Sequence, residues 1–443
     1  MPQLKTHIGI VGTGIAGCSA AYFARKAFPE ARISVYEADS RIGGRINSIT
    51  FAGVPVELGA TFLHSGNRTL IELINAVSLE SKKAEGRDAN KPITVGVWNG
   101  QQFVWRVSGE GFLAQLRLAS QYGISLLRIK RRVDEMLRRW RSVDQLQSTQ
   151  PAFADPADLL RKARLHDLLD VTLNDFLDEY HVSERVRYEI CDPICRAIFN
   201  QAGTINAFAG LVALAGGNVG GGQVLSIRGG NRLLCENLLK ASGASVLLGH
   251  RVASIRSEAN GSITVKDAGG TNTFDAVIVA APLETGRIEI SAAAGPLNLP
   301  QNRVFQIAHV TCVAGTLAAK AFGLPAGAVL PEIVLTTESE VPFSVINPVG
   351  PCPAAPHRVY KNQSREPLSD NVLAPFFESI SDVRRIHWNA YPVLAPSISH
   401  SSFLLAKGIY YVDCMESTAS TLETQTVASK NVVELIRGDQ ILH

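Results

Sequence analysis

The sequence predicts an α/β fold that opens with a strand–helix–strand unit, and three observations near the N-terminus lead to this prediction. Residues 8–11 form a short apolar run that is typical of a buried strand. A glycine-rich turn and a helical segment, residues 20–26, follow it. A second apolar run, residues 32–36, then ends in an acid, Glu37. This order is typical of α/β units that bind dinucleotides.

The glycines of the turn have the spacing G-x-G-x-x-G, at Gly12, Gly14 and Gly17. Gly12 permits the tight turn from strand to helix, Gly14 lets a diphosphate approach the backbone, and Gly17 lets the helix pack closely on the strand. The free N–H groups at the helix N-terminus, around Ile15 and Ala16, are expected to bind the same diphosphate.

Glu37 lies 20 positions after Gly17, where a carboxylate would bind the ribose hydroxyls of a dinucleotide. The two strands, the glycines, the helix and the acid together predict a dinucleotide site. The alternative is a chance glycine-rich turn in an ordinary α/β core.

The residues after Glu37 distinguish between dinucleotides. They contain an Arg-x-Gly-Gly-Arg pattern made of Arg41, Gly43, Gly44 and Arg45. This pattern resembles the GG-doublet flavoproteins, which include amine oxidases, phytoene desaturases and prenylcysteine oxidases. The resemblance implies an FAD cofactor, with Gly44 in the loop under the diphosphate and the Arg45 guanidinium neutralising it. The alternative is a glycine-rich surface turn with a solvated arginine.

Three further segments resemble the same flavoproteins. Residues 56–64 match the segment whose backbone runs beside the isoalloxazine, which implies a contact from Ala60. Val252 matches a residue whose backbone contacts the adenine. A strand near residue 410, followed by Glu416 and a helix over about 421–437, resembles the last FAD element, where the helix dipole points at the flavin or its phosphates.

The fold class that follows is α/β, with a Rossmann-type, amine-oxidase-like FAD-binding domain and a discontinuous mixed α+β substrate domain. Residues 1–80, 222–290 and 401–443 are assigned to the FAD-binding domain. Residues 81–221 and 291–400 are assigned to the substrate domain, with a helical insert over 109–200. Within it, the Asn99-Gly100 pair between two apolar runs predicts a hairpin, and residues 290–400 suggest many short strands and turns.

Composition restricts the class of protein further. The chain has 443 residues, 46% of them hydrophobic, which is typical of a globular protein. A net charge of only +3 argues against a nucleic-acid binder. The seven cysteines show no zinc spacing, so we expect buried free thiols and no metal site. No apolar run is long enough to span a membrane, and the few residues before the first strand leave no room for a signal peptide, so we expect a cytoplasmic protein.

Residues 125–141 predict an amphipathic helix with an unusual charge. The apolar side chains of its predicted buried face are Leu126, Ile129, Val133, Met136 or Leu137, and Trp140. Seven basic residues and two acids occupy the rest of this segment. One interpretation is a helix packed in the substrate domain with a solvated basic face; the alternative is peripheral contact with an anionic membrane.

Several segments in chain order resemble the prenylcysteine oxidase (prenylcysteine lyase) family, namely residues 196–201, 205–210, 228–233, 389–392 and 410–419. The resemblance implies FAD-dependent cleavage of the thioether in S-farnesyl- or S-geranylgeranyl-cysteine. The products would be cysteine, an isoprenoid aldehyde and H₂O₂, with O₂ as acceptor. The implied partners are therefore a small hydrophobic thioether and O₂, with no nucleic acid.

Two residues are candidates for roles at the reacting end. His64 matches a family position beside the flavin, where it would orient water or balance charge; the alternative is a structural histidine. Tyr391 would line the substrate tunnel or belong to the core. Three function classes stay open from the sequence: a thioether oxidase, an amine oxidase or desaturase on the same fold, and a flavin-binding protein without activity.

Overall fold

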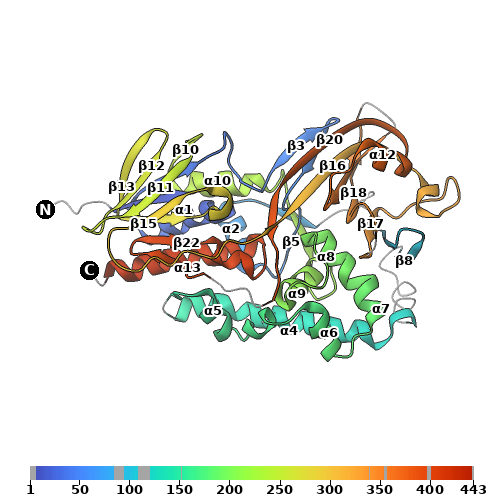
Figure 1. The fold of residues 1–443 in the computed structure, drawn as a ribbon, viewed down its shortest axis with the longest axis horizontal. Helices are drawn as coiled ribbons and strands as arrows, with labels where there is room; N and C mark the ends of the chain where they lie inside the picture. The colour runs from blue at the N-terminus through green and yellow to red at the C-terminus, as the bar shows by residue number, and fades with distance from the viewer. Residues whose placement is uncertain are drawn as a thin grey trace.

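A computed structural model describes residues 6–83, 94–107, 120–150, 152–338, 340–353, 357–396 and 401–441. Two halves lie side by side in it (Figure 1). One half contains both chain termini, and the other contains a long-stranded sheet above a group of helices. The first residues of the predicted helical insert, 109–119, lie outside the described ranges.

The first half is built on a six-stranded sheet with the order β10-β2-β1-β14-β22-β21. Its strands are β1 (His7–Val11), β2 (Arg32–Glu37), β10 (Ser245–Leu248), β14 (Ala276–Val279), β21 (Leu404–Ala406) and β22 (Ile409–Tyr411). All neighbouring pairs are parallel except β21–β22. The predicted Rossmann-type α/β fold is confirmed, and its strands come from the three separate segments that the sequence assigned to one domain.

Three helices flank this sheet: α1 (Ile15–Ala27), α10 (Arg232–Ser242) and α13 (Leu422–Ile441). Helix α1 contacts both of the others. A second sheet, ordered β13-β12-β11-β15, contains β11 (Val252–Ser257), β12 (Ile263–Asp267), β13 (Gly270–Phe274) and β15 (Glu289–Ala292). A Cβ on Gly9 would lie 3.0 Å from the ring of Phe274, so β1 is covered closely on that side. The central strands are therefore buried, as parallel strands require.

The second half contains a seven-stranded sheet with the order β20-β16-β19-β18-β17-β7-β8. Its strands are β7 (Val95–Trp98), β8 (Phe103–Val107), β16 (Phe305–Leu317), β17 (Ile333–Thr336), β18 (Val345–Pro351), β19 (Arg358–Ser364) and β20 (Phe377–Pro392). The predicted hairpin around Asn99 and Gly100 is confirmed as β7–β8.

The expected short strands over 290–400 include β17, β18 and β19, but the sequence did not predict the two long strands, because β16 and β20 have 13 and 16 residues. Strand β20 is an edge strand with exposed polar residues such as Asp382 and Arg384 in its middle, which look like a turn in the sequence. The middle of β16 is buried on both faces and lacks the alternation that identifies a strand.

The helical layer lies below this sheet (Figure 1). It contains α4 (Ile124–Thr149), α5 (Pro156–Lys162), α6 (Leu173–Glu179), α7 (Glu184–Val186), α8 (Asp192–Phe199) and α9 (Ala207–Gly216). Helix α4 confirms the predicted amphipathic helix and continues to Thr149, beyond the predicted end at residue 141. Its buried face contains Ile129, Val133, Met136 and Trp140, whereas Leu126 is only half-buried.

Smaller elements complete the described part of the fold. Two short sheets contain β3 (Ser48–Phe51) with β4 (Val54–Glu57), and β5 (Leu63–His64) with β9 (Val224–Ile227) and β6 (Ser81–Lys83). Further α-helices are α2 (Arg68–Ala76), α11 (Leu283–Gly286) and α12 (Asp370–Leu373). All seven cysteines are free thiols, and only Cys352 is not fully buried, which confirms the prediction of buried free thiols. In the described ranges, no helix combines the length and apolar character needed to cross a bilayer.

Candidate functional site

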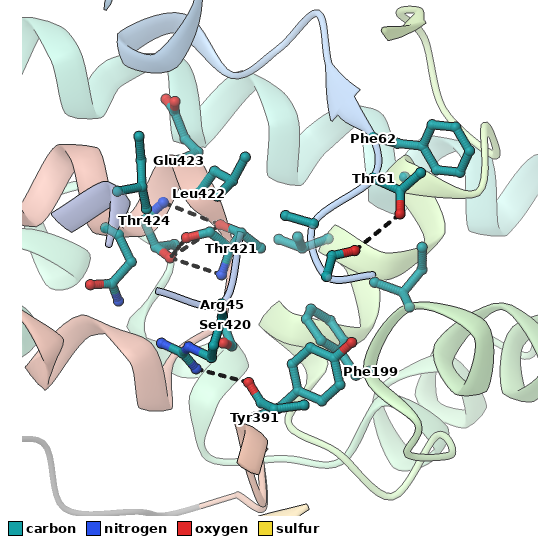
Figure 2. A pocket seen from close by; sticks show the side chains of 18 of the residues that line it. Arg45, Thr61, Phe62, Phe199, Tyr391, Ser420, Thr421, Leu422, Glu423 and Thr424 are labelled. Atoms are coloured by element: carbon teal, nitrogen blue, oxygen red, sulfur yellow. Dashed lines mark hydrogen bonds between the residues drawn. The ribbon is translucent and has the colours of Figure 1, made fainter. Parts of the chain in front are cut away.

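One continuous cavity of about 1680 Å³ lies between the two halves. This volume exceeds the roughly 300–1,000 Å³ of a typical small-molecule site, so it has room for two ligands. Figure 2 shows Thr421 and Leu422 on one side of the pocket, Thr61 and Phe62 on the other, and the rings of Tyr391 and Phe199 next to each other. One end of the cavity is built from the N-terminal glycine turn and the other end from apolar helices.

The glycine turn at the first end combines two different requirements. Gly12 has φ +108°, and a Cβ there would come within 2.6 Å of the Ala280 carbonyl oxygen. A Cβ on Gly17 would lie 1.9 Å from the Gly12 carbonyl oxygen. Both glycines are therefore required by packing within the protein. A Cβ on Gly14, by contrast, meets nothing within 4 Å. Since Gly14 lines the cavity, this open space suits the close approach of a ligand.

The second glycine pair packs directly against this turn. The Gly43 N–H donates to the Thr13 carbonyl oxygen at 3.0 Å. Gly44 has φ +55°, and a Cβ there would lie 3.2 Å from the Gly14 Cα. Ile15 and Ala16, in the first turn of α1, line the cavity beside them, whereas Gly17 does not. The two motifs thus form one backbone cradle at the carboxyl edge of the sheet.

Glu37 is held at the end of β2 with its carboxylate at the cavity. Its Oε2 accepts hydrogen bonds from the Thr13 backbone N–H, at 2.9 Å, and from the Thr13 hydroxyl. Its Oε1 accepts from the Asp39 N–H at 2.9 Å. Val252, at the start of β11, lines the same end of the cavity. These positions suit the predicted contacts to ribose and adenine.

Arg45 lines the cavity, and Glu416 lies behind it. The Arg45 Nη1 donates to the Ala390 carbonyl oxygen at 2.8 Å and to the Glu416 carboxylate. Glu416 is fully buried and is not a lining residue; its Oε2 is 3.7 Å from Nη1 of Arg303. Glu416 therefore orients the arginine from behind the cavity lining, and its Oε2 has no hydrogen-bond partner within the described ranges.

Asp413 is the acid that lines the cavity here, and the sequence interpretation did not include it. It is 2% exposed, and its Oδ2 has no hydrogen-bond partner within the described ranges. Burial and the nearby Glu416 carboxylate raise the pKa of Asp413 to about 7. The sequence does contain a signal for Asp413, because this acid follows β22 almost directly. The 3₁₀ turn Asp413–Ser417, which the sequence does not show, decides that Asp413 faces the cavity.

His64 lines the cavity with only 9% exposure. Its Nδ1 accepts a hydrogen bond from the Gly66 N–H at 3.0 Å. A Cβ on Gly222 would come within 2.5 Å of its Nε2. Burial lowers the pKa of His64, so the imidazole is neutral at pH 7. The ring is thus fixed by the backbone of two glycine-containing turns.

Tyr391 and Ala60 also line the cavity. The Tyr391 ring packs edge-on against Phe199, with ring centroids 5.7 Å apart. Burial raises the pKa of the Tyr391 hydroxyl, and the neighbouring Gln363 amide partly opposes this effect. The Ala60 carbonyl oxygen accepts a hydrogen bond from the Asn231 side chain at 2.6 Å, which fixes the loop after β4.

The second end of the cavity is apolar. Its walls come from helices α4, α8 and α9 and from strand β17 of the seven-stranded sheet, and they include Trp140, Ile194, Ile198, Phe208, Val212 and Leu335. Two buried polar side chains of β19, Lys361 and Gln363, line the cavity as well. The sequence analysis did not identify either residue, because a polar residue in a strand can face solvent or a cavity and the sequence does not distinguish the two. The arrangement can place an elongated apolar molecule next to a dinucleotide.

Two family models match the chain. The model described as prenylcysteine lyase matches residues 107–440, and the model described as an NAD(P)-binding Rossmann-like domain matches residues 10–77. Farnesylcysteine lyase of Arabidopsis thaliana is 30% identical over 449 residues, covering 96% of this chain and 87% of the relative. Prenylcysteine oxidase 1 of Homo sapiens is 27% identical over 456 residues, covering 97% and 88%.

Solved structures share the fold. A putrescine oxidase bound to putrescine matches with a TM-score of 0.65 at 17% identity, covering 99% of this chain and all of that chain. Cyclohexylamine oxidase from Brevibacterium oxydans matches with a TM-score of 0.62 at 16% identity, with the same coverage. The family model spans most of the chain, and the relatives span nearly all of it. The chain therefore belongs to the prenylcysteine lyase family.

Proposed function

We propose that this protein is an FAD-dependent thioether oxidase that cleaves S-prenyl-cysteine. Thioether, water and O₂ give cysteine, isoprenoid aldehyde and H₂O₂, so that two electrons and two hydrogens pass to O₂. The observation that carries the proposal is the continuous cavity that joins a dinucleotide cradle to an apolar chamber. Bound FAD supplies the redox chemistry, accepting a hydride from the prenyl carbon next to sulfur and passing the electrons to O₂.

The residues of the cradle fit FAD. Gly14 leaves open space for a diphosphate, Arg45 supplies a cation beside it, and Glu37 supplies a carboxylate for ribose. Residues 420–425, at the N-terminus of α13, bring a second helix end to the cavity. Asp413 offers an uncommitted carboxylate oxygen there. The chain's own task is to bind the cofactor and to hold the prenyl carbon against it.

Product analysis tests this proposal. Incubation with S-farnesyl-cysteine in air is expected to yield farnesal, cysteine and H₂O₂ in equal amounts. Peroxide formed only from amines would indicate an amine oxidase, and oxidation of an isoprenoid hydrocarbon without peroxide would indicate a desaturase. Either result would contradict the thioether reaction.

We propose that His64 is a positioning residue for the reacting end, because its ring lines the cavity and is held there by the hydrogen bond from the Gly66 N–H and by close packing on Gly222. His64→Ala is expected to slow the anaerobic reduction of the flavin by substrate about tenfold, since small displacements at a reacting centre are costly. Stopped-flow absorbance measures this rate. His387→Ala, which changes an exposed histidine of β20, is the control. An unchanged single-turnover rate in His64→Ala would contradict the role.

We infer that residues 125–141 of α4, with the side chains around its first turn, make peripheral contact with an anionic membrane. Ile124 and Leu127 are 59% and 58% exposed, and Phe62 is 49% exposed. Leu127 and Phe62 also line the cavity, so exposed apolar side chains surround an opening through which a prenyl chain would enter.

The basic face of α4 supports this contact only in part. Lys130, Arg132 and Arg139 form ion pairs within the helix. Arg131 and Arg138 are exposed, and neither has an ion-pair partner in the part of the chain that the structure describes. These arginines suit lipid phosphates.

Sedimentation with phosphatidylserine vesicles tests the contact. The double variant Ile124→Ser/Leu127→Ser is expected to lose about five-fold in vesicle affinity, because two apolar side chains no longer enter the interface. Val329→Ser, which changes another exposed apolar residue, is the control. Equal binding of all three proteins, or no binding by any, would contradict membrane contact.

The free thiols fit a reducing compartment, and we propose the cytoplasm, which cell fractionation tests.

A further inference from the structure

The cavity wall beside the loop after β4 contains a buried positive charge that the proposed hydride transfer does not use. Lys361 on β19 is 7% exposed and lines the cavity. Its Nζ donates to the Glu57 carbonyl oxygen at 2.9 Å and to the Thr61 hydroxyl at 2.8 Å. An ammonium group has three N–H donors, so one stays uncommitted. No carboxylate of the described residues lies within 4 Å of this Nζ to form an ion pair.

A buried charge without a counter-ion is costly and needs a partner. Burial lowers the pKa of Lys361 to about 8, while the neighbouring Cys312 thiol and Glu57 carboxyl act in the opposite direction. Lys361 therefore still has its positive charge at pH 7. Glu57 does not neutralise it by direct contact, since Lys361 bonds to the backbone oxygen of Glu57 and not to its carboxylate.

A second polar group lies two residues along the same strand. Gln363 is 8% exposed and lines the cavity, and its Nε2 has no hydrogen-bond partner within the described ranges. Residues i and i+2 of a strand point to the same face, roughly 7 Å apart along it. A cation and an unsatisfied amide donor thus face the same cavity, which matches an acceptor with two oxygens.

We propose that Lys361 and Gln363 form the subsite for the α-carboxylate of the substrate's amino-acid head. This inference rests on the proposed function, because the head group is defined by the thioether substrate. The diphosphate end of the cavity has its own cation, Arg45, together with two helix N-termini. Lys361 and Gln363 face the cavity from β19, so a carboxylate attached to a prenyl thioether would be bound between the ammonium and the amide.

The subsite restricts the substrate class. An S-prenyl amino acid with a free carboxylate is preferred over its methyl ester and over the analogue without a carboxylate. The discrimination is expected to be strong, because a substrate without a carboxylate leaves the buried Lys361 ammonium unpaired.

The experiment compares three substrates: S-farnesyl-cysteine, its methyl ester and S-farnesyl-cysteamine. In the unmodified protein, kcat/KM for the acid is expected to exceed that for the cysteamine by about 100-fold. Lys361→Met is expected to reduce this ratio to about threefold, because kcat/KM falls for S-farnesyl-cysteine and not for the cysteamine. Gln363→Leu is expected to lower the same ratio less, by about tenfold, since only one neutral hydrogen-bond donor is lost.

Two controls complete the experiment. Lys361→Arg retains the charge and is expected to restore most of the preference, and Lys266→Met changes an exposed lysine of β12. Equal rates for all three substrates in the unmodified protein, or an equal loss for all three in Lys361→Met, would overturn the subsite. The latter result, with an altered flavin spectrum, would instead place Lys361 against the cofactor. No turnover of any thioether by the unmodified protein would refute the proposed function itself.

Discussion

Gly14→Val is expected to abolish FAD binding while leaving the fold intact. A Cβ at Gly14 meets no protein atom within 4 Å, and the backbone there has φ −65°, which valine can adopt. The added side chain would project into the space that the cofactor diphosphate must occupy. We expect the purified variant to be colourless, with FAD affinity reduced by at least about 100-fold, because the close backbone approach is blocked.

The matched control is Gly17→Val. A Cβ at Gly17 would come within 1.9 Å of the Gly12 carbonyl oxygen, so this substitution is expected to disrupt the fold as well as FAD binding. Circular dichroism and thermal unfolding of the FAD-free proteins distinguish the two effects. A yellow Gly14→Val protein with unchanged FAD affinity would show that the diphosphate does not lie at this turn.

Gly216→Phe is expected to close the apolar end of the cavity to long prenyl chains. Gly216 is the last residue of α9 and lines the cavity. A Cβ there meets only the Ile198 Cδ1, at 3.8 Å, so a phenylalanine ring has open space to enter. We expect kcat/KM for S-farnesyl-cysteine to fall by at least about 100-fold, because the ring takes the place of the isoprenoid tail.

The same variant is expected to keep its FAD and to oxidise S-dimethylallyl-cysteine at close to the normal rate. Gly438→Phe, at an exposed position of α13, is the control for adding a phenylalanine. Parallel loss of the short and long substrates, with FAD content unchanged, would show that the prenyl tail does not extend toward α9.

The nucleotide end of the site could be predicted from the sequence because its chemistry depends on local backbone geometry. Gly12, Gly14 and Gly44 act through the turns in which they lie, so their spacing is enough to identify them. Glu37 could be identified by its place at the end of a strand. Gly17 was also identified, but its role is to permit packing and not to contact the ligand.

The rest of the site depends on long-range packing, which spacing does not show. The sequence indicated an acid after the last strand, and the 3₁₀ turn that begins at Asp413 decides that Asp413, and not Glu416, lines the cavity. Lys361 reaches the loop after β4 across 300 residues of chain to bond Thr61. Such contacts exist only once the two halves are joined.

The most direct test of the central claim is anaerobic mixing of the purified protein with S-farnesyl-cysteine while the visible absorbance of the flavin is recorded. The thioether oxidase mechanism predicts that the flavin bleaches, and that colour returns with formation of H₂O₂ when air is admitted. A flavin that stays oxidised with this substrate would retain the fold and the cofactor but contradict the reaction. A protein that binds no FAD at all would contradict the assignment of the cavity.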